Sequence, residues 1–190
     1  DAYQLLTGEK RVVESYPLWE KESLRDEENP LQPYHVTEPL ALKVYAEGRF
    51  VMDPGQAGTK LSASGRLLGG CMDCLVNLLG TGYDGTAAFC EKYKEDGILW
   101  MLEACDLNVM SIRRAMWQME QAGWFRYVKG FLFGRALNSQ PMMDLDACQA
   151  VLAVASKYHV PVIMDLDIGH LSPMMPLVVG SVATVTLEGN

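Results

Sequence analysis

The chain has 190 residues, of which 49% are hydrophobic and 21% charged, and its formal net charge at pH 7 is −8. This composition suits one domain with a core of its own and excludes a chain that is disordered throughout. The negative charge argues against nucleic acid and anionic membrane as partners, because both attract basic surfaces. No apolar run approaches the ~20 residues that cross a bilayer, and no signal peptide is visible.

Residues 1–35 are polar and interrupted, and we expect them to form a linker. Leu5 and Leu6, followed by Thr7 and Gly8, are typical of a helix end. Asp1 would then fall inside a helix, which suggests a processed or truncated chain. Residues 11–15 favour a short strand, and the charged, proline-containing run 21–33 is typical of a connecting segment. The domain itself is expected over residues 36–190.

From residue 40 onward, apolar segments favour strands and helices in alternation. The expected strands are two in residues 41–52, joined by a turn near Gly48, then 64–68, 98–102, 127–133, 161–166 and one or two in 178–187. Residues 64–68 end at Gly69 and Gly70. Residues 98–102 are apolar throughout, as in the centre of a parallel sheet. The alternation predicts the α/β class.

Three helices are expected between these strands. Residues 71–79 are apolar nearly all round, which predicts a short, deeply buried helix. Asn108 can cap a second helix that stops at Gly123. Asp144 can cap a third. The apolar faces are Val109, Ile112, Met116 and Met119 in the second helix, and Leu145, Cys148, Leu152 and Ala155 in the third.

The chain has five cysteines, at positions 71, 74, 90, 105 and 148. Cys71 and Cys74 form a C-x-x-C motif, but no second such motif or H-x₃₋₅-H accompanies it as a zinc site requires. A thioredoxin-like redox pair would need the motif to open a helix after a strand, and this context fits. The alternative is two thiols one turn apart on a helix starting at Gly70, acting as small hydrophobic groups. Reduced cysteines indicate the cytoplasm.

Glu103 directly follows the apolar run 98–102. Proteins of the α/β class place working groups at the carboxyl ends of buried strands. Burial raises the pKa of such a carboxylate unless a cation or a hydrogen-bond donor offsets it. The alternative is a strand-end glutamate that faces water or caps the following loop.

His170 is the candidate base among three histidines. It follows Gly169 in the loop after the strand 161–166, where the backbone is fixed while the ring stays accessible. A structural histidine is the alternative. His159 lies at a polar helix end, where we expect it to be solvated, and His35 is assigned no role.

Glu103 and His170 together suggest general acid–base catalysis or a nucleophile–His–acid triad. No serine of the sequence stands in a G-x-S-x-G elbow. Ser172 lies too close to His170 in the chain, and Ser62 and Ser64 are typical of turns. If this is a triad, its serine lies outside the sequence.

Four segments resemble, in this order, the LD-carboxypeptidase family. They are residues 65–81, with the Gly-Gly pair and a following helix; 97–103 (GILWMLE); 112–135; and 169–180, which begins Gly-His-Leu-Ser-Pro. The resemblance covers about residues 60–190, and the shared order of the motifs carries it. The sequence departs from the family at Cys71, where asparagine is frequent, and at Val178, where proline is usual.

The resemblance implies the C-terminal domain of that family, with a small mixed β-sheet or barrel-like core and flanking helices. It implies that Glu103 is the acid and His170 the base of the triad. The serine and the oxyanion hole would belong to an N-terminal domain, whose tail and linker are residues 1–35. Gly69, Gly70 and Cys71 would contribute to substrate binding. No metal or organic cofactor is expected, and the chain alone is expected to be inactive.

The activity implied is that of a cytoplasmic serine carboxypeptidase of murein recycling, which hydrolyses the L,D amide bond to a terminal D-alanine in tetrapeptides. The implied partners are the N-terminal domain of the same protein, the murein peptide and a second copy in a homodimer. A methionine-rich set is a candidate for the dimer surface, although methionines at helical spacing also favour the core. Its members are Met110, Met116, Met142 and Met143.

Two alternatives stay open. Some members of the family cleave peptide–nucleotide antibiotics of the microcin C kind, and an aromatic side chain that stacks on the base would distinguish them. Tyr83 and Trp100 are the candidates for that contact. The other alternative is a non-catalytic dimerisation or binding domain, which a Glu103 and His170 beyond hydrogen-bond reach would favour.

Overall fold

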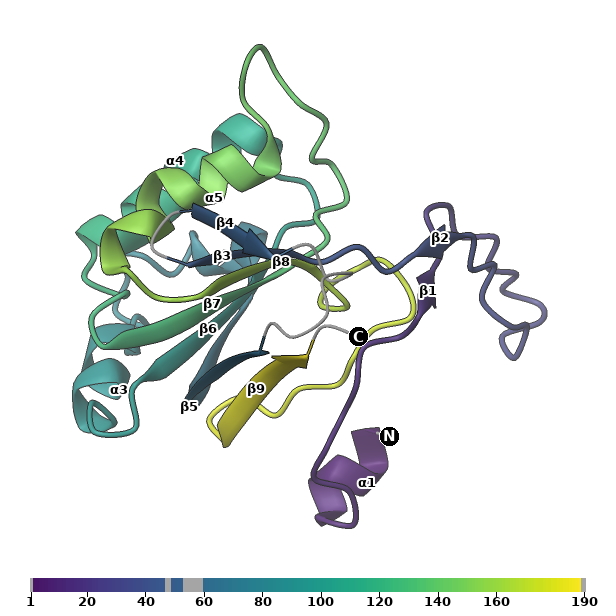
Figure 1. Ribbon diagram of the computed structural model, residues 1–190, viewed down its shortest axis with the longest axis horizontal. Helices are drawn as coiled ribbons and strands as arrows, with labels where there is room; N and C mark the ends of the chain where they lie inside the picture. Colours follow the sequence, from purple (N-terminus) through teal and green to yellow (C-terminus); the bar gives the residue numbers. More distant parts are fainter. Residues whose placement is uncertain (1, 47–48, 53–59, 189–190) are drawn as a thin grey trace.

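A computed structural model describes residues 2–46, 49–52 and 60–188 of the chain (Figure 1). Its main sheet has the spatial strand order β4-β3-β8-β7-β6-β5-β9. The strands of this sheet are β3 (Lys43–Ala46), β4 (Arg49–Met52), β5 (Lys60–Cys71), β6 (Ile98–Glu103), β7 (Val128–Gly134), β8 (Val162–Leu166) and β9 (Val182–Glu188). A separate antiparallel pair is formed by β1 (Leu18–Trp19) and β2 (Glu38–Pro39).

The central strands of the main sheet are parallel. Each of the pairs β5–β6, β6–β7 and β7–β8 is parallel. On the two sides of this group, β3 pairs antiparallel with β8, and β9 pairs antiparallel with β5. All residues of β6 are buried, which accounts for its unbroken apolar sequence. The sheet is mixed and curls, with helices on its flank (Figure 1), so the predicted fold class is confirmed.

Helices α4 and α5 lie together on one face of the sheet (Figure 1). The helices are α1 (Ala2–Thr7), α2 (Met72–Leu75), α3 (Thr86–Lys92), α4 (Val109–Gln121) and α5 (Ala147–Ala155). The predicted cap of α4 is confirmed, because the Asn108 side chain accepts a hydrogen bond from the Ser111 backbone N–H at 3.0 Å. The four residues of its predicted apolar stripe are all fully buried.

Aromatic side chains fill the space between this sheet face and the helices. The rings of Trp100 and Trp124 stack at 5.8 Å between centroids, and Phe125 meets Trp100 edge-on at 5.4 Å. Such pairs stabilise a core beyond their burial of apolar area. Trp100 is therefore part of the core.

The prediction of a deeply buried helix over residues 71–79 is wrong. Cys71 ends β5 and only Met72–Leu75 is helical, while Leu78 is exposed. The strand continues through Gly69 because this residue has a φ of 141°, and a Cβ atom on it would lie 1.8 Å from the Met101 carbonyl oxygen. Glycine here permits a close approach of two strands and does not end the strand.

Other boundaries also differ from the prediction. The strand predicted over residues 64–68 is longer in the structure and runs over Lys60–Cys71. Its first half was missed because exposed and half-buried residues alternate there, and pairing with β9 makes it a strand. Residues 178–187 contain one strand, β9, among the described residues. Residues 11–15 are described and form no strand. Helix α3 was not predicted, because its sequence TAAFCEK is short and only Cys90 is buried.

Helix α5 begins two residues later than predicted. Its cap is Asp146 and not Asp144: the Asp146 side chain accepts from the Gln149 backbone N–H at 2.7 Å, and the Gln149 side chain accepts from the Asp146 N–H at 2.9 Å. Of the predicted face, Cys148 and Ala155 are buried, while Leu145 and Leu152 are only partly buried.

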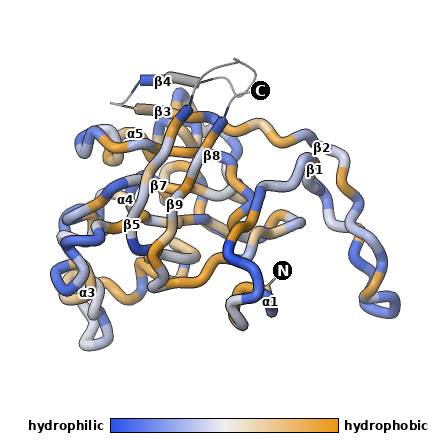
Figure 2. Tube along the Cα trace, turned by 60° about the horizontal axis from the view of Figure 1, so that its bottom comes forward, coloured by the Kyte–Doolittle hydropathy of each residue, from blue (hydrophilic) through white to orange (hydrophobic). Residues whose placement is uncertain are grey.

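The other face of the sheet carries a second apolar cluster, which includes Leu99 and Leu132. A cavity of about 810 Å³ lies against this face, with Leu5 of α1 and Leu187 of β9 among its walls. The segment between β1 and β2 projects away from the sheet and is mostly hydrophilic (Figure 2). Within the described residues, no helix has the length and apolar character needed to cross a membrane.

Candidate active site

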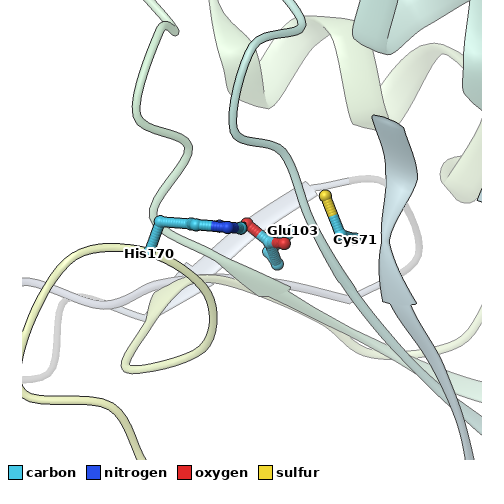
Figure 3. A group of neighbouring side chains, drawn as sticks. All are labelled: Cys71, Glu103 and His170. Carbon is cyan, nitrogen blue, oxygen red and sulfur yellow. The ribbon is translucent and has the colours of Figure 1, made fainter. Parts of the chain in front are cut away.

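Glu103 ends β6 at the carboxyl edge of the parallel strands, where the sequence predicts it. The residue is only 4% exposed. The β5–β6 register pairs it with Cys71, so that carboxylate and thiol lie side by side (Figure 3). Residues paired in this way on neighbouring strands present their side chains to the same face of a sheet. The end of the buried strand therefore holds an acid in a fixed position.

His170 reaches this carboxylate from the loop that follows β8. Its Nδ1 atom lies 2.9 Å from Glu103 Oε2. Gly169 makes the approach possible, because a Cβ atom at this position would stand 2.6 Å from the same oxygen. Its φ of 112° also favours glycine. Figure 3 shows Glu103 between His170 and Cys71.

The two side chains of this pair differ strongly in exposure. The His170 side chain is 48% exposed and that of Glu103 only 5%. With Glu103 Oε2 as the acceptor of this hydrogen bond, Nδ1 is the donor and Nε2 keeps its lone pair. A buried acid that fixes this tautomer of a solvent-accessible imidazole is the arrangement a general base requires.

The Cys71 thiol lies beside Glu103 and is the third polar side chain of the site. Burial, together with the hydrogen bond to Glu103 and the charge of that residue, raises the pKa of Cys71 to about 12. Cys71 ends β5 and Cys74 lies in the short helix α2, so the motif spans the change from strand to helix, and both cysteines are free thiols. A thiol with a raised pKa is nevertheless a poor attacking group, which counts against a thioredoxin-like exchange.

A buried ion pair supports the loop of His170 on one side. The Arg135 guanidinium donates to the fully buried Asp167 carboxylate, and its Nη1 also donates to the Asp165 carbonyl at 2.9 Å. The other oxygen of Asp167 accepts from the Tyr16 backbone N–H at 2.9 Å. Asp167, three positions before His170, is thereby fixed by Arg135 just after β7 and by the N-terminal segment.

The N-terminal segment also binds the loop beyond His170. The Glu20 backbone N–H donates to the Ser172 carbonyl at 2.8 Å. Trp19 lies over the Arg135 guanidinium, with 4.8 Å from Cζ to the ring centroid. The chain around His170 is thus held from both sides by residues 16–20.

Asp73 anchors the loop that follows Glu103. Its carboxylate accepts hydrogen bonds from the backbone N–H groups of Cys105 and Asp106, both at 2.9 Å. Partial burial would raise the pKa of Asp73, but these donors outweigh it and lower the pKa. This fixes the turn that carries the chain away from the site.

Sequence reasoning missed the supporting residues Arg135, Asp167 and Asp73. Asp167 had a usable signal, because it is an acidic residue directly after the strand β8. Glu103 was predicted from the same kind of position, at the end of an apolar run. Asp73 had none, since its partners lie 32 and 33 residues away in the chain.

The remaining predicted residues differ in their exposure. Gly70 precedes Cys71 in β5, and a Cβ atom on it would meet no atom within 4 Å. Trp100 is 1% exposed in the core and has no free face for a nucleobase, so this candidate is wrong. Tyr83 is 89% exposed. His159 is exposed at the end of a helical turn, as predicted.

The methionines of the predicted dimer surface separate into two kinds. Met116 is fully buried in the core, whereas Met142 and Met143 are 40% and 91% exposed. Met110 is partly buried. The set is therefore not one continuous surface.

The sequence of residues 64–185 matches the family model of the LD-carboxypeptidase C-terminal domain. This segment contains Glu103, His170, the whole of β6, β7 and β8, and most of β5. No curated protein matches the chain.

Several solved structures share the fold. An MccF-like protein from Streptococcus pneumoniae in complex with AMP has 17% identity and a TM-score of 0.60, over 99% of this chain and 54% of that one. The microcin C7 self-immunity protein MccF in complex with aspartyl sulfamoyl adenosine has 15% identity and a TM-score of 0.66, with the same coverage. An MccF-like protein from Bacillus anthracis has 18% identity and a TM-score of 0.58, over 93% and 50%. The chain thus spans about half the length of these relatives.

Proposed function

The chain belongs to the LD-carboxypeptidase family through its C-terminal domain, and on this premise we propose that Glu103 and His170 are the acid and the base of a serine-peptidase triad. In this proposal, residues 36–190 form the catalytic domain that carries both groups. Residues 1–35 are the linker and the tail of an N-terminal domain of the same protein. That domain provides the nucleophilic serine and the oxyanion hole.

The hydrogen bond between His170 Nδ1 and Glu103 Oε2 is the observation that carries the proposal. At 2.9 Å it has the length of a good N–H···O bond, and its acceptor is buried while the ring stays accessible. A non-catalytic domain has no need to keep a buried carboxylate against a half-exposed imidazole. Burying a carboxylate without a partner costs on the order of several kcal/mol of folding free energy.

The proposed reaction is acyl transfer to serine followed by hydrolysis. His170 Nε2 accepts the serine proton while the hydroxyl oxygen attacks the carbonyl carbon, and Glu103 stabilises the imidazolium that forms. The imidazolium then gives its proton to the leaving amine as the C–N bond breaks. Water then attacks the acyl carbonyl and loses a proton to Nε2, and the imidazolium returns that proton to the serine oxygen as the ester C–O bond breaks and the acid is released.

We propose the L,D amide bond to a terminal D-alanine in murein tetrapeptides as the substrate bond, in a cytoplasmic enzyme of murein recycling. The support is the description of the matched family. Gly69, Gly70 and Cys71 would form part of the substrate wall, because β5 brings them to the edge of the sheet beside Glu103. A homodimer is part of the same proposal.

A peptide–nucleotide hydrolase of the microcin C kind is the second candidate. It is favoured by the adenine compounds bound in two similar structures, AMP and aspartyl sulfamoyl adenosine. Because Trp100 is buried, Tyr83 is the remaining aromatic candidate for stacking on a base.

The test uses the longer protein that carries this chain after its N-terminal domain. D-alanine release from a murein tetrapeptide is measured beside hydrolysis of an aspartyl sulfamoyl adenosine analogue. We expect His170→Ala to lower kcat by about 10³–10⁴-fold, as loss of a triad base does. Glu103→Gln should lower it by a similar factor, since the tautomer is then no longer fixed.

The matched control is His35→Ala, which removes an exposed imidazole. The hydrogen bond from this residue to the Glu20 carboxylate is donated by its backbone N–H, which alanine keeps. It should retain wild-type rates. Folded wild-type protein that hydrolyses only the nucleotide analogue would transfer the proposal to the second candidate. Hydrolysis that survives in both site variants would remove the triad.

A further inference from the structure

Cys71, Glu103 and His170 place three different metal-ligand types around one point. The thiol sulfur, a carboxylate oxygen and an imidazole nitrogen all lie within 4.8 Å of one another. Figure 3 shows the three side chains directed toward the same region from two strands and a loop. The proposed hydrolase requires only two of these groups for proton transfer.

The scaffold under the three groups is rigid. The β5–β6 pairing fixes Cys71 opposite Glu103, and Gly169 packs against the Glu103 side chain. Ligands built on strands keep their geometry better than ligands built on loops alone. Only His170 comes from a loop, and the Asp167 and Glu20 hydrogen bonds hold that loop.

The spacing suits a tetrahedral ion after small side-chain rotations. A zinc ion lies about 2.3 Å from thiolate sulfur and about 2.0–2.2 Å from imidazole nitrogen or carboxylate oxygen. Two ligands of such an ion stand roughly 3.3–3.8 Å apart by the same geometry. The Nδ1–Oε2 pair, at 2.9 Å, would open slightly and the sulfur would move in.

We propose that Cys71, Glu103 and His170 form a Zn²⁺ site with three protein ligands and one open position. Sulfur, nitrogen and oxygen ligands together suit Zn²⁺, whereas Mg²⁺ and Ca²⁺ prefer oxygen alone. Water fills the fourth position, and the half-exposed face of His170 is the entry path. Binding releases the thiol proton of Cys71 to solvent.

Zinc in this site would switch off the proposed hydrolase, an effect that rests on the proposed function. A neutral imidazole that binds metal through Nδ1 carries its hydrogen on Nε2. Nε2 then has no lone pair to accept the serine proton. Glu103, now a ligand, also no longer orients the ring. The same three residues thus exist in a catalytic state and a metal-bound state that exclude each other.

The binding experiment uses the 190-residue chain and Co²⁺ as a spectroscopic probe, with competition by Zn²⁺. We expect one ion per chain, a thiolate-to-cobalt charge-transfer band, and intense visible bands typical of tetrahedral cobalt. Cys71→Ser should abolish the charge-transfer band. His170→Ala should weaken binding at least about tenfold. Circular dichroism confirms that each variant is folded.

The matched control is Cys74→Ser, which removes an exposed thiol three residues away. It should keep the band and the affinity. A band that persists in Cys71→Ser, or disappears in Cys74→Ser, would overturn the proposed ligand set. Absence of any cobalt bands in the folded wild type would overturn the site.

The activity arm separates this proposal from the previous one. The longer protein is assayed with increasing Zn²⁺, and each variant is compared with its own zinc-free rate. Wild type should lose activity at the zinc concentration that displaces cobalt, and Cys71→Ser should keep its own rate there. Bands without any hydrolysis by the wild type would leave the metal site standing and remove the hydrolase. Hydrolysis by the wild type without any cobalt bands would leave the hydrolase standing and remove the metal site.

Discussion

Gly169 packs directly on the Glu103 carboxylate, at the oxygen that holds His170. A Cβ atom on residue 169 would lie 2.6 Å from Oε2 and 3.0 Å from the Glu103 Cβ. Any side chain at this position therefore displaces the acid, the loop of the base, or both. The close approach ties the position of the His170 loop to the end of the central strand.

Gly169→Ala should separate the pair without unfolding the domain. We expect at least a hundredfold loss of kcat in the longer protein, because small misplacement of a catalytic group costs about that much. Stability should fall by about 1–3 kcal/mol, since φ is 112°. The matched control is Gly180→Ala: its φ is 84°, but the added Cβ atom meets nothing within 4 Å. It should lose similar stability and keep kcat.

Removing one partner of the Arg135–Asp167 pair should be strongly destabilising. Asp167→Leu leaves a buried guanidinium without its partner, which costs about 3–5 kcal/mol. The double variant Arg135→Met with Asp167→Leu should lose less than the sum of the single variants, because no charge is left unpaired. Urea unfolding of the four proteins measures the coupling. Additive losses would contradict the account.

The Cys71 thiol should react slowly with iodoacetamide. With a pKa of about 12, its thiolate fraction at pH 8 is roughly a thousandfold below that of an ordinary cysteine. The exposed Cys74 serves as an internal reference, followed by mass spectrometry of both peptides. Glu103→Gln removes a neighbouring charge and should accelerate alkylation of Cys71. Equal rates at both cysteines of the wild type would refute the raised pKa.

Asp73 should make the domain more stable at neutral than at acid pH. Partial burial opposes ionisation, but the Cys105 and Asp106 backbone N–H groups lower the pKa of Asp73 below that of the unfolded chain. Its contribution is thus present above the unfolded pKa of about 4 and is lost as the pH falls through the folded pKa. Asp73→Asn should be less stable than wild type at pH 7, with a smaller difference at pH 3. Urea unfolding at both values checks this.

The cap of α5 gives a direct comparison of two aspartates. Asp146→Ala removes the capping box and should cost about 1 kcal/mol. Asp144→Ala, two residues earlier, alters an exposed residue outside the helix and should change stability by less than about 0.5 kcal/mol. Thermal unfolding of both variants decides which aspartate is the cap.

The sequence predicted the elements whose pattern is local. Strand β6 is an apolar run of the right length, and α4 combines a capping asparagine with an apolar stripe of helical period. Glu103 and His170 could be predicted from the sequence because Glu103 ends an apolar strand and His170 lies in the loop that follows another. Their mutual contact was expected from the chemistry of an acid and a histidine and from the family resemblance, but not from their spacing, since 67 residues separate them.

The wrong predictions have physical causes that a short stretch of sequence does not contain. Residues 71–79 have the composition of a helix, but Gly69 and the Met101 carbonyl extend the strand through a contact between two chain segments. Asp144 and Asp146 are equally good caps in isolation, and the reciprocal bond of Gln149 selects the second. The Arg135–Asp167 pair joins two strand ends across 32 residues, so spacing gives no sign of it.

The backbone bonds from Tyr16 and Glu20 to either side of His170 have a mechanical consequence. Residues 16–20 are thereby fastened to the loop of His170 itself. In the proposed two-domain protein this segment is the linker, so a tilt of the N-terminal domain would pull on the imidazole through two short tethers.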